Sequence, residues 1–85
     1  MVFKYTPTGV CSREITIDVN EDNETINSVS FVGGCNGNLK GIGALVQGKT
    51  IDEVVDVLEG IDCNYKGTSC PDQLAKALSL IQEQL

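Results

Sequence analysis

The feature that most constrains the fold is a strict alternation of apolar and polar residues near the N-terminus. In residues 14–19 (EITIDV) every second side chain is apolar, which is typical of a half-buried strand. The polar run 20–24 (NEDNE) predicts a solvated turn, and residues 25–32 read as the next strand. Residues 2–6 supply a third. These segments predict a small antiparallel sheet whose best-defined buried face carries Ile15, Ile17 and Val19.

Three helices are expected after the strands. Apolar residues recur at helical spacing over about 38–47. Thr50 and Glu53 form a capping box for the next helix, which Gly60 ends. The last helix is expected over 71–84, with an apolar stripe.

The first helix contains two interruptions. Gly41 and Gly43 each cost about 1 kcal/mol relative to alanine in a helix. Close packing against a neighbour, or fraying, would explain them.

Strands first and helices after predict an α+β fold in the order β-β-β-α-α-α, with the helices on one face of a three-stranded antiparallel sheet. The 85 residues (1–85) are expected to form a single domain.

Charge and composition exclude two function classes. The formal net charge is −6, and the six Lys and Arg residues form no dense cluster, which argues against nucleic acid as a partner. Because the chain has no histidine, it cannot supply a Ser-His or Cys-His nucleophile by itself. Any metal site must use sulfur together with carboxylate or water.

The N-terminal segment and the cysteine count bear on location. Residues 1–7 lack the basic and long apolar regions of a signal peptide, and no segment approaches the ~20 apolar residues of a membrane span. We therefore expect a cytoplasmic protein without a membrane partner. Disulfides are disfavoured in the cytoplasm. An even number of cysteines in that setting favours metal or thiol chemistry.

The four cysteines lie at the ends of expected elements. Cys11 precedes the strong strand, Cys35 lies in a glycine-rich turn before a helix, Cys63 lies in a loop, and Cys70 stands at the last helix. None forms a C-x-x-C pair, so spacing alone identifies no zinc ribbon or thioredoxin motif.

The segment 67–72 (GTSCPD) places Cys70 at a helix start. Pro71 is favoured as the first helical residue, which predicts Cys70 as the N-cap. Its sulfur would then face unpaired N–H groups and the positive end of the helix dipole, an environment that favours the thiolate.

If the fold gathers these sulfurs, they form a closed tetrahedral set for zinc or the ligands of an iron–sulfur cluster. Two alternatives remain open. Two or three of the cysteines would be small buried hydrophobes, or Cys63 and Cys70, which are seven positions apart, would form a redox pair.

The glycines around Cys35 admit a further interpretation. Gly33, Gly37 and the following helix faintly resemble a phosphate-binding turn. The full G-x-G-x-x-G pattern is missing, and a tight turn around a metal ligand explains the glycines as well. Whether a nucleotide binds stays open.

Two sets of residues carry a family resemblance. The run 68–72 (TSCPD), with 34–38 (GCNGN) upstream, resembles the TSCPD domain over nearly the whole chain. That domain occurs near the C-terminus of adenosylcobalamin-dependent ribonucleotide reductases and as small free-standing proteins. The resemblance implies an accessory link to deoxyribonucleotide synthesis, and a ribonucleotide reductase or another cytosolic protein as a partner. It does not imply catalysis, because the chain is too short for the reductase barrel, radical site and cobalamin pocket.

A more distant resemblance is to the NifU-like iron–sulfur scaffold proteins. In that family, cysteines at the places of Cys11, Cys35 and Cys70 hold a nascent cluster or zinc on a three-stranded sheet with helices. This sequence departs from the family pattern at Arg13, where the family has an aspartate, and at Ser69, where it has a histidine. Cys63 is additional and would complete a closed, more permanent site. The resemblance implies an iron–sulfur scaffold or carrier as an alternative function.

Overall fold

The computed structural model of the protein describes residues 1–34, 36–63 and 67–85. The predicted α+β class and the order of the elements are confirmed, and most of the predicted boundaries lie within two residues of the observed ones. The elements are β1 (Val2–Tyr5), β2 (Ser12–Asn20), β3 (Thr25–Gly33), α1 (Asn36–Val46), α2 (Ile51–Leu58) and α3 (Cys70–Gln84).

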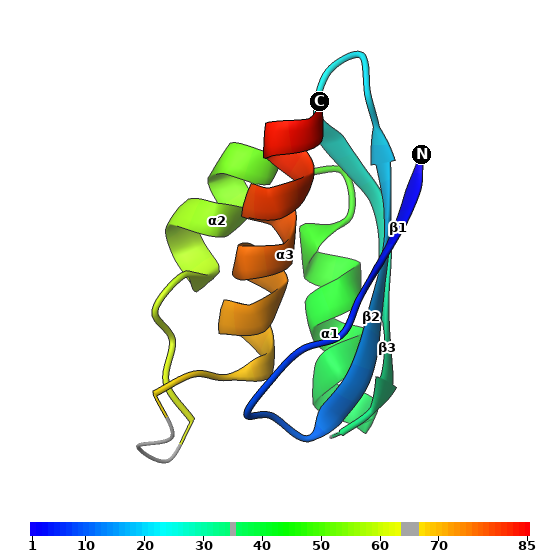
Figure 1. Ribbon diagram of the computed structural model, residues 1–85. Coiled ribbons are helices and arrows are strands. Elements are labelled where there is room, and N and C mark those ends of the chain that lie inside the picture. The colour runs from blue at the N-terminus through cyan, green and yellow to red at the C-terminus, as the bar shows by residue number, and fades with distance from the viewer. Residues whose placement is uncertain (35, 64–66) are drawn as a thin grey trace.

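The sheet has β2 at its centre, antiparallel to β1 on one side and to β3 on the other. Alternation along β2 sends Ile15, Ile17 and Val19 to one face, where all three are fully buried. All three helices lie on that side of the sheet (Figure 1). Thr16 and Asp18, on the other face of β2, pair with Ser30 and Ser28 of β3, so that face is polar.

The core forms where α3 meets the apolar face of the sheet. Leu74 and Leu78, one helical turn apart, are fully buried, and Ile51 of α2 joins them. In the described part of the chain, no helix has the length and apolarity that crossing a membrane requires.

The start of α2 follows the predicted capping box. The Thr50 hydroxyl accepts a hydrogen bond from the Glu53 N–H at 3.2 Å, and the Glu53 carboxylate accepts one from the Thr50 N–H at 3.2 Å. The bond from the Thr50 backbone, with help from the Thr50 hydroxyl, lowers the pKa of Glu53.

The two glycines of α1 have different surroundings. A Cβ added to Gly43 would lie 2.7 Å from the carbonyl oxygen of Val29, so α1 approaches β3 as closely as only glycine allows. A Cβ added to Gly41 would meet nothing within 4 Å. Close packing therefore explains Gly43, while nothing in the described chain requires Gly41.

Candidate functional site

Helix α3 begins differently from the prediction. Its N-cap is Ser69, not Cys70, and Cys70 is the first helical residue. The Asp72 N–H donates to the Ser69 hydroxyl at 3.1 Å, and that hydroxyl donates to the Ile61 carbonyl at 2.6 Å. A serine oxygen is a favoured cap, and Ser69-x-x-Asp72 matches the first half of a capping-box pattern, so the sequence did contain the signal.

Two of the predicted sulfurs come together. The Sγ atoms of Cys11 and Cys70 lie 4.0 Å apart, although the residues are 59 positions apart in the chain. Cys11 is exposed and Cys70 is buried. A disulfide needs ~2.05 Å, whereas two sulfurs bound to one tetrahedral zinc at ~2.3 Å lie about 3.8 Å apart. The observed separation suits two reduced thiols that could share one metal ion.

The neighbours of these sulfurs fix their positions. The hydroxyl of Ser12, buried at the start of β2, is hydrogen-bonded to Cys70 Sγ at 3.3 Å. A Cβ added to Gly34 would lie 3.2 Å from Cys11 Sγ and 2.8 Å from Leu39, so the glycine turn passes directly over the exposed sulfur. With φ at +79°, Gly34 also has a backbone conformation that favours glycine.

A pocket of about 510 Å³ contains three of the predicted site residues. Cys11, Cys63 and Cys70 line it, with α1 forming much of the opposite wall. Across residues 1–34, 36–63 and 67–85, no group of three or more cysteine or acidic side chains is close enough to hold a metal ion. The predicted ligand Cys35 lies outside the described residues. The structure thus joins Cys11 to Cys70 and places Cys63 on the same pocket. The lining residues on α1 are Gly37, Asn38, Leu39, Gly41, Ile42 and Leu45.

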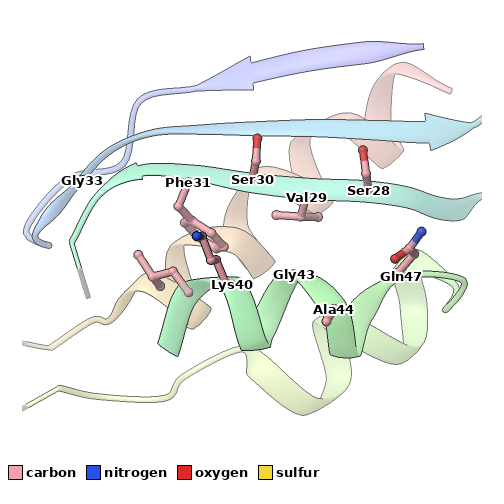
Figure 2. A pocket seen from close by; sticks show the side chains of 10 residues that line it. Ser28, Val29, Ser30, Phe31, Gly33, Lys40, Gly43, Ala44 and Gln47 are labelled. Carbon is pink, nitrogen blue, oxygen red and sulfur yellow. The ribbon is translucent and has the colours of Figure 1, made fainter. Parts of the chain in front are cut away.

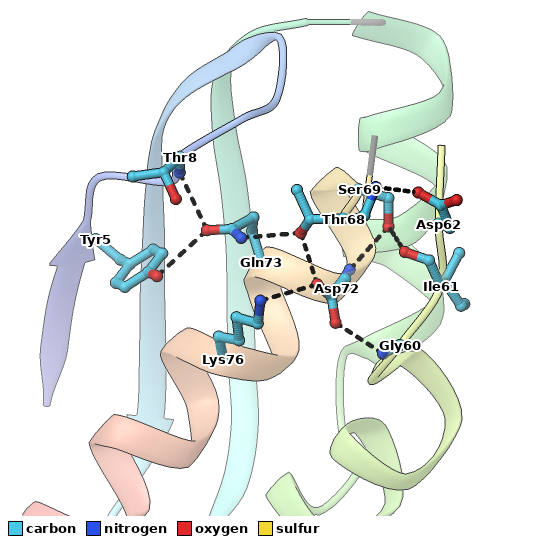
Figure 3. Close-up of polar contacts among 11 residues, drawn as sticks. Tyr5, Thr8, Gly60, Ile61, Asp62, Thr68, Ser69, Asp72, Gln73 and Lys76 are labelled. Atoms are coloured by element: carbon cyan, nitrogen blue, oxygen red, sulfur yellow. Dashed lines mark hydrogen bonds and ion pairs between the residues drawn. The ribbon is translucent and has the colours of Figure 1, made fainter. Parts of the chain in front are cut away.

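Asp72 anchors the segment that carries Cys70. Its carboxylate, 3% exposed, accepts hydrogen bonds from the Thr68 hydroxyl at 2.6 Å and from the Gly60 N–H at 2.7 Å, and Lys76 lies 3.3 Å away. The Thr68 hydrogen bond is the main cause that lowers the pKa of Asp72, against the opposing effect of burial. The carboxylate thereby fixes the loop before α3 to the end of α2 (Figure 3).

Gln73 anchors the start of α3 to the N-terminal loop, a role that the sequence analysis did not identify. Its amide oxygen accepts from the Thr8 N–H at 3.1 Å and the Tyr5 hydroxyl at 3.3 Å, and its amide nitrogen donates to Thr68 at 2.9 Å (Figure 3). The loop that leads to Cys11 is therefore tied directly to the helix that carries Cys70. A glutamine in the first turn of a helix gives no sequence signal for this role.

A second cleft, of about 350 Å³, lies between β3 and α1. Lys40 lines it, but Ser28 and Ser30 point away from α1, while Phe31 points toward it (Figure 2). The cleft gathers no convergent polar groups, and none of the described cysteines lines it. It offers no support for a phosphate-binding site.

The sequence was compared with models of known protein families, with curated proteins and with solved structures. The sequence model of the TSCPD domain matches residues 1–82. Neither the curated proteins nor the solved structures contain a match. The distant resemblance to NifU-like scaffold proteins gains no support from them.

Proposed function

Because this chain belongs to the TSCPD domain family, we propose that it is an accessory module associated with ribonucleotide reductase and that it carries a cysteine-liganded metal site. The family resemblance supports the link to the reductase and to the synthesis of DNA precursors. In this role the chain would assist such an enzyme.

The observation that supports the metal site is the 4.0 Å separation of Cys11 and Cys70 Sγ atoms. These two residues would hold the ion, and Ser12 would orient the Cys70 sulfur through its hydroxyl. Cys63 lines the same pocket but is too far from the other two sulfurs to share an ion with them as the structure stands, so it would have to move closer to become a ligand. Cys35 is the other proposed ligand. A set of sulfurs without histidine suits zinc or an iron–sulfur cluster. Binding of the metal would stabilise the folded state of this small domain.

Thermal unfolding of the anaerobically purified protein, with and without a chelator, tests this proposal. A ligand at a thousand times its Kd stabilises the folded state by about 4 kcal/mol, which in a domain of this size raises Tm by more than about 15 °C. We expect Cys11→Ser and Cys70→Ser each to abolish the rise. A chelator-independent Tm in the wild-type protein would exclude the site.

The colour of the same preparation separates zinc from the iron–sulfur alternative. A colourless protein that is stabilised by zinc supports the accessory module. Visible absorbance after anaerobic expression, with transfer of the cluster to an acceptor protein, would favour the scaffold or carrier function instead.

A second candidate function is a thiol relay. The short distance between the sulfurs of Cys11 and Cys70 makes these two cysteines the proposed redox pair, in place of the predicted pair Cys63 and Cys70. The two thiols would lose two protons and two electrons to form a disulfide, and a disulfide of the partner reductase would become a dithiol. Oxidation with glutathione disulfide should then lower the protein mass by two hydrogens and link Cys11 to Cys70. Peptide mapping that finds another pair, or none, would remove this candidate.

A further inference from the structure

The pair formed by Cys11 and Cys70 supplies only part of the ligands that a metal ion needs. A tetrahedral ion takes four ligands. In the described part of the chain, no third cysteine or acidic side chain lies close enough to join these two sulfurs. Cys35 can fill one of the two remaining positions. At least one position is therefore left for a ligand that the fold, as it stands, does not supply.

The space beside the pair is large enough for such a ligand. Both sulfur-bearing residues line the pocket of about 510 Å³, a volume within the range of small-molecule sites. Elsewhere the sulfurs have protein neighbours, because the Ser12 hydroxyl is hydrogen-bonded to Cys70 Sγ at 3.3 Å and Gly34 lies against Cys11 Sγ. Since Cys70 is only 8% exposed, a ligand reaches the pair through the pocket.

The lining of the pocket selects the chemistry of the ligand. None of the described residues that line it is charged, so a phosphate or carboxylate group finds no ion-pair partner there. The Ser69 hydroxyl is already engaged, because it accepts from the Asp72 N–H and donates to the Ile61 carbonyl. Thiolate sulfur is the donor that suits an ion already held by two cysteines. The pocket therefore favours a ligand with a sulfur donor and an apolar body.

Helix α1 presents bare backbone to this pocket at two positions. Gly37 and Gly41 are one helical turn apart, so they share a face of the helix, and both line the pocket. A Cβ added to either glycine would meet nothing within 4 Å. Because glycine is a poor helix former, packing within the described chain does not account for these two residues. A ligand body that rests on the bare backbone does.

We propose that the pocket binds a small apolar thiol, whose sulfur completes the coordination of the ion held by Cys11 and Cys70 and whose body packs on Gly37 and Gly41. The inference rests on the metal site proposed above and names the outside ligand of that site. Binding forms one metal–sulfur bond, and the S–H proton passes to solvent, so no oxidant or reductant is needed. A charged thiol binds more weakly, because nothing in the described lining pairs with its charge.

The test uses cobalt(II) in place of zinc, because its visible absorbance reports both the ion and its ligands. One equivalent is added to the anaerobic, metal-free protein, and the spectrum is recorded before any thiol is present. Benzyl mercaptan is then titrated, with benzyl alcohol as its sulfur-free match and mercaptoethanesulfonate as the charged thiol. We expect benzyl mercaptan to add sulfur-to-cobalt charge-transfer absorbance and to bind about tenfold more tightly than the sulfonate. Benzyl alcohol should leave the spectrum unchanged.

Two leucine substitutions on α1 test where the body of the thiol lies. Gly41→Leu fills space in the pocket and should weaken benzyl mercaptan about tenfold, with cobalt still bound. Unspecific apolar adhesion would instead become stronger. Ala44→Leu is the matched control at an exposed position of the same helix that lines the cleft toward β3, and it should change the affinity less than about twofold. Equal affinities of the two variants would overturn the proposal.

Failure of the metal site and failure of the thiol site give different results. A protein that takes up no cobalt would remove both, whereas a cobalt-loaded protein whose spectrum no thiol changes would overturn the thiol site alone. Thiol binding that appears only in Cys63→Ser would show that Cys63 moves to fill the open position. A cobalt-dependent dimer in sedimentation would show that a second copy fills it. Either result would contradict the proposal, as would loss of cobalt from the protein to benzyl mercaptan on gel filtration.

Discussion

Asp72 illustrates how a single residue stabilises this fold. A carboxylate that is 3% exposed would be costly without partners, and here the Thr68 hydroxyl, the Gly60 N–H and Lys76 supply them. Because these partners lower its pKa, the ionised form contributes stability to the folded protein. That contribution is present above the unfolded pKa of ~3.9 and is lost as the pH falls through the lower folded pKa.

We predict that Asp72→Asn lowers the free energy of unfolding by about 2 kcal/mol near neutral pH. An amide has one acceptor oxygen, so it cannot accept from the Gly60 N–H on one side and from Thr68 and Lys76 on the other. Urea unfolding at neutral pH and at successive pH values below ~3.9 measures the effect. The difference between wild type and variant should shrink on acidification. A difference that stays constant over this range would show that the charge of Asp72 does not matter.

At the scale of elements, α1 offers a matched pair of glycines. Gly43→Ala places a methyl group 2.7 Å from the Val29 carbonyl oxygen, so helix and strand must separate. We expect a loss of about 1–3 kcal/mol. Gly41→Ala meets no atom within 4 Å and should stabilise the protein by up to about 1 kcal/mol through helix propensity. Thermal unfolding compares the two variants, and effects of the same sign would contradict the packing of α1 on β3.

Most elements could be predicted from the sequence because local periodicity determines them. The alternation in residues 14–19 defined β2, and Thr50 with Glu53 defined the start of α2. The start of α3 was predicted wrongly because Pro71 was placed first in the helix, while the hydroxyl of Ser69 makes the better cap.

The candidate site was less predictable than the fold. Position at the ends of elements indicated which cysteines to consider, and the closeness of Cys11 and Cys70 fits that hypothesis. Which two sulfurs meet depends on how β2 and α3 pack together. A separation of 59 residues carries no local pattern for such a contact.

At the scale of the whole molecule, Gln73 joins the N-terminal loop, the loop before α3 and α3 itself. It is 2% exposed and bonds to Tyr5, Thr8 and Thr68. Through these bonds, the segment of Cys11 and the segment of Cys70 keep a fixed relation. The separation of the two sulfurs therefore depends on contacts beyond the cysteines themselves.

We predict that Gln73→Ala destabilises the protein by about 2 kcal/mol, since the part-buried hydrogen bonds to Tyr5, Thr8 and Thr68 are lost. Amide hydrogen exchange should also become faster at Thr8 than in the wild-type protein. Gln82→Ala is the control on the same helix, where the amide bonds only exposed Glu24 and Asp52, and it should leave both quantities almost unchanged. Unaltered exchange at Thr8 in Gln73→Ala would refute the proposed link.

We propose that Cys11 and Cys70 are two ligands of one bound metal site. Elemental analysis of the native protein, purified without oxygen, tests it most directly, with Cys11→Ser and Cys70→Ser prepared in parallel. We expect about one zinc ion or one cluster per wild-type chain and loss of the metal in both variants. Wild-type protein free of metal, with four freely titrating thiols, would contradict it.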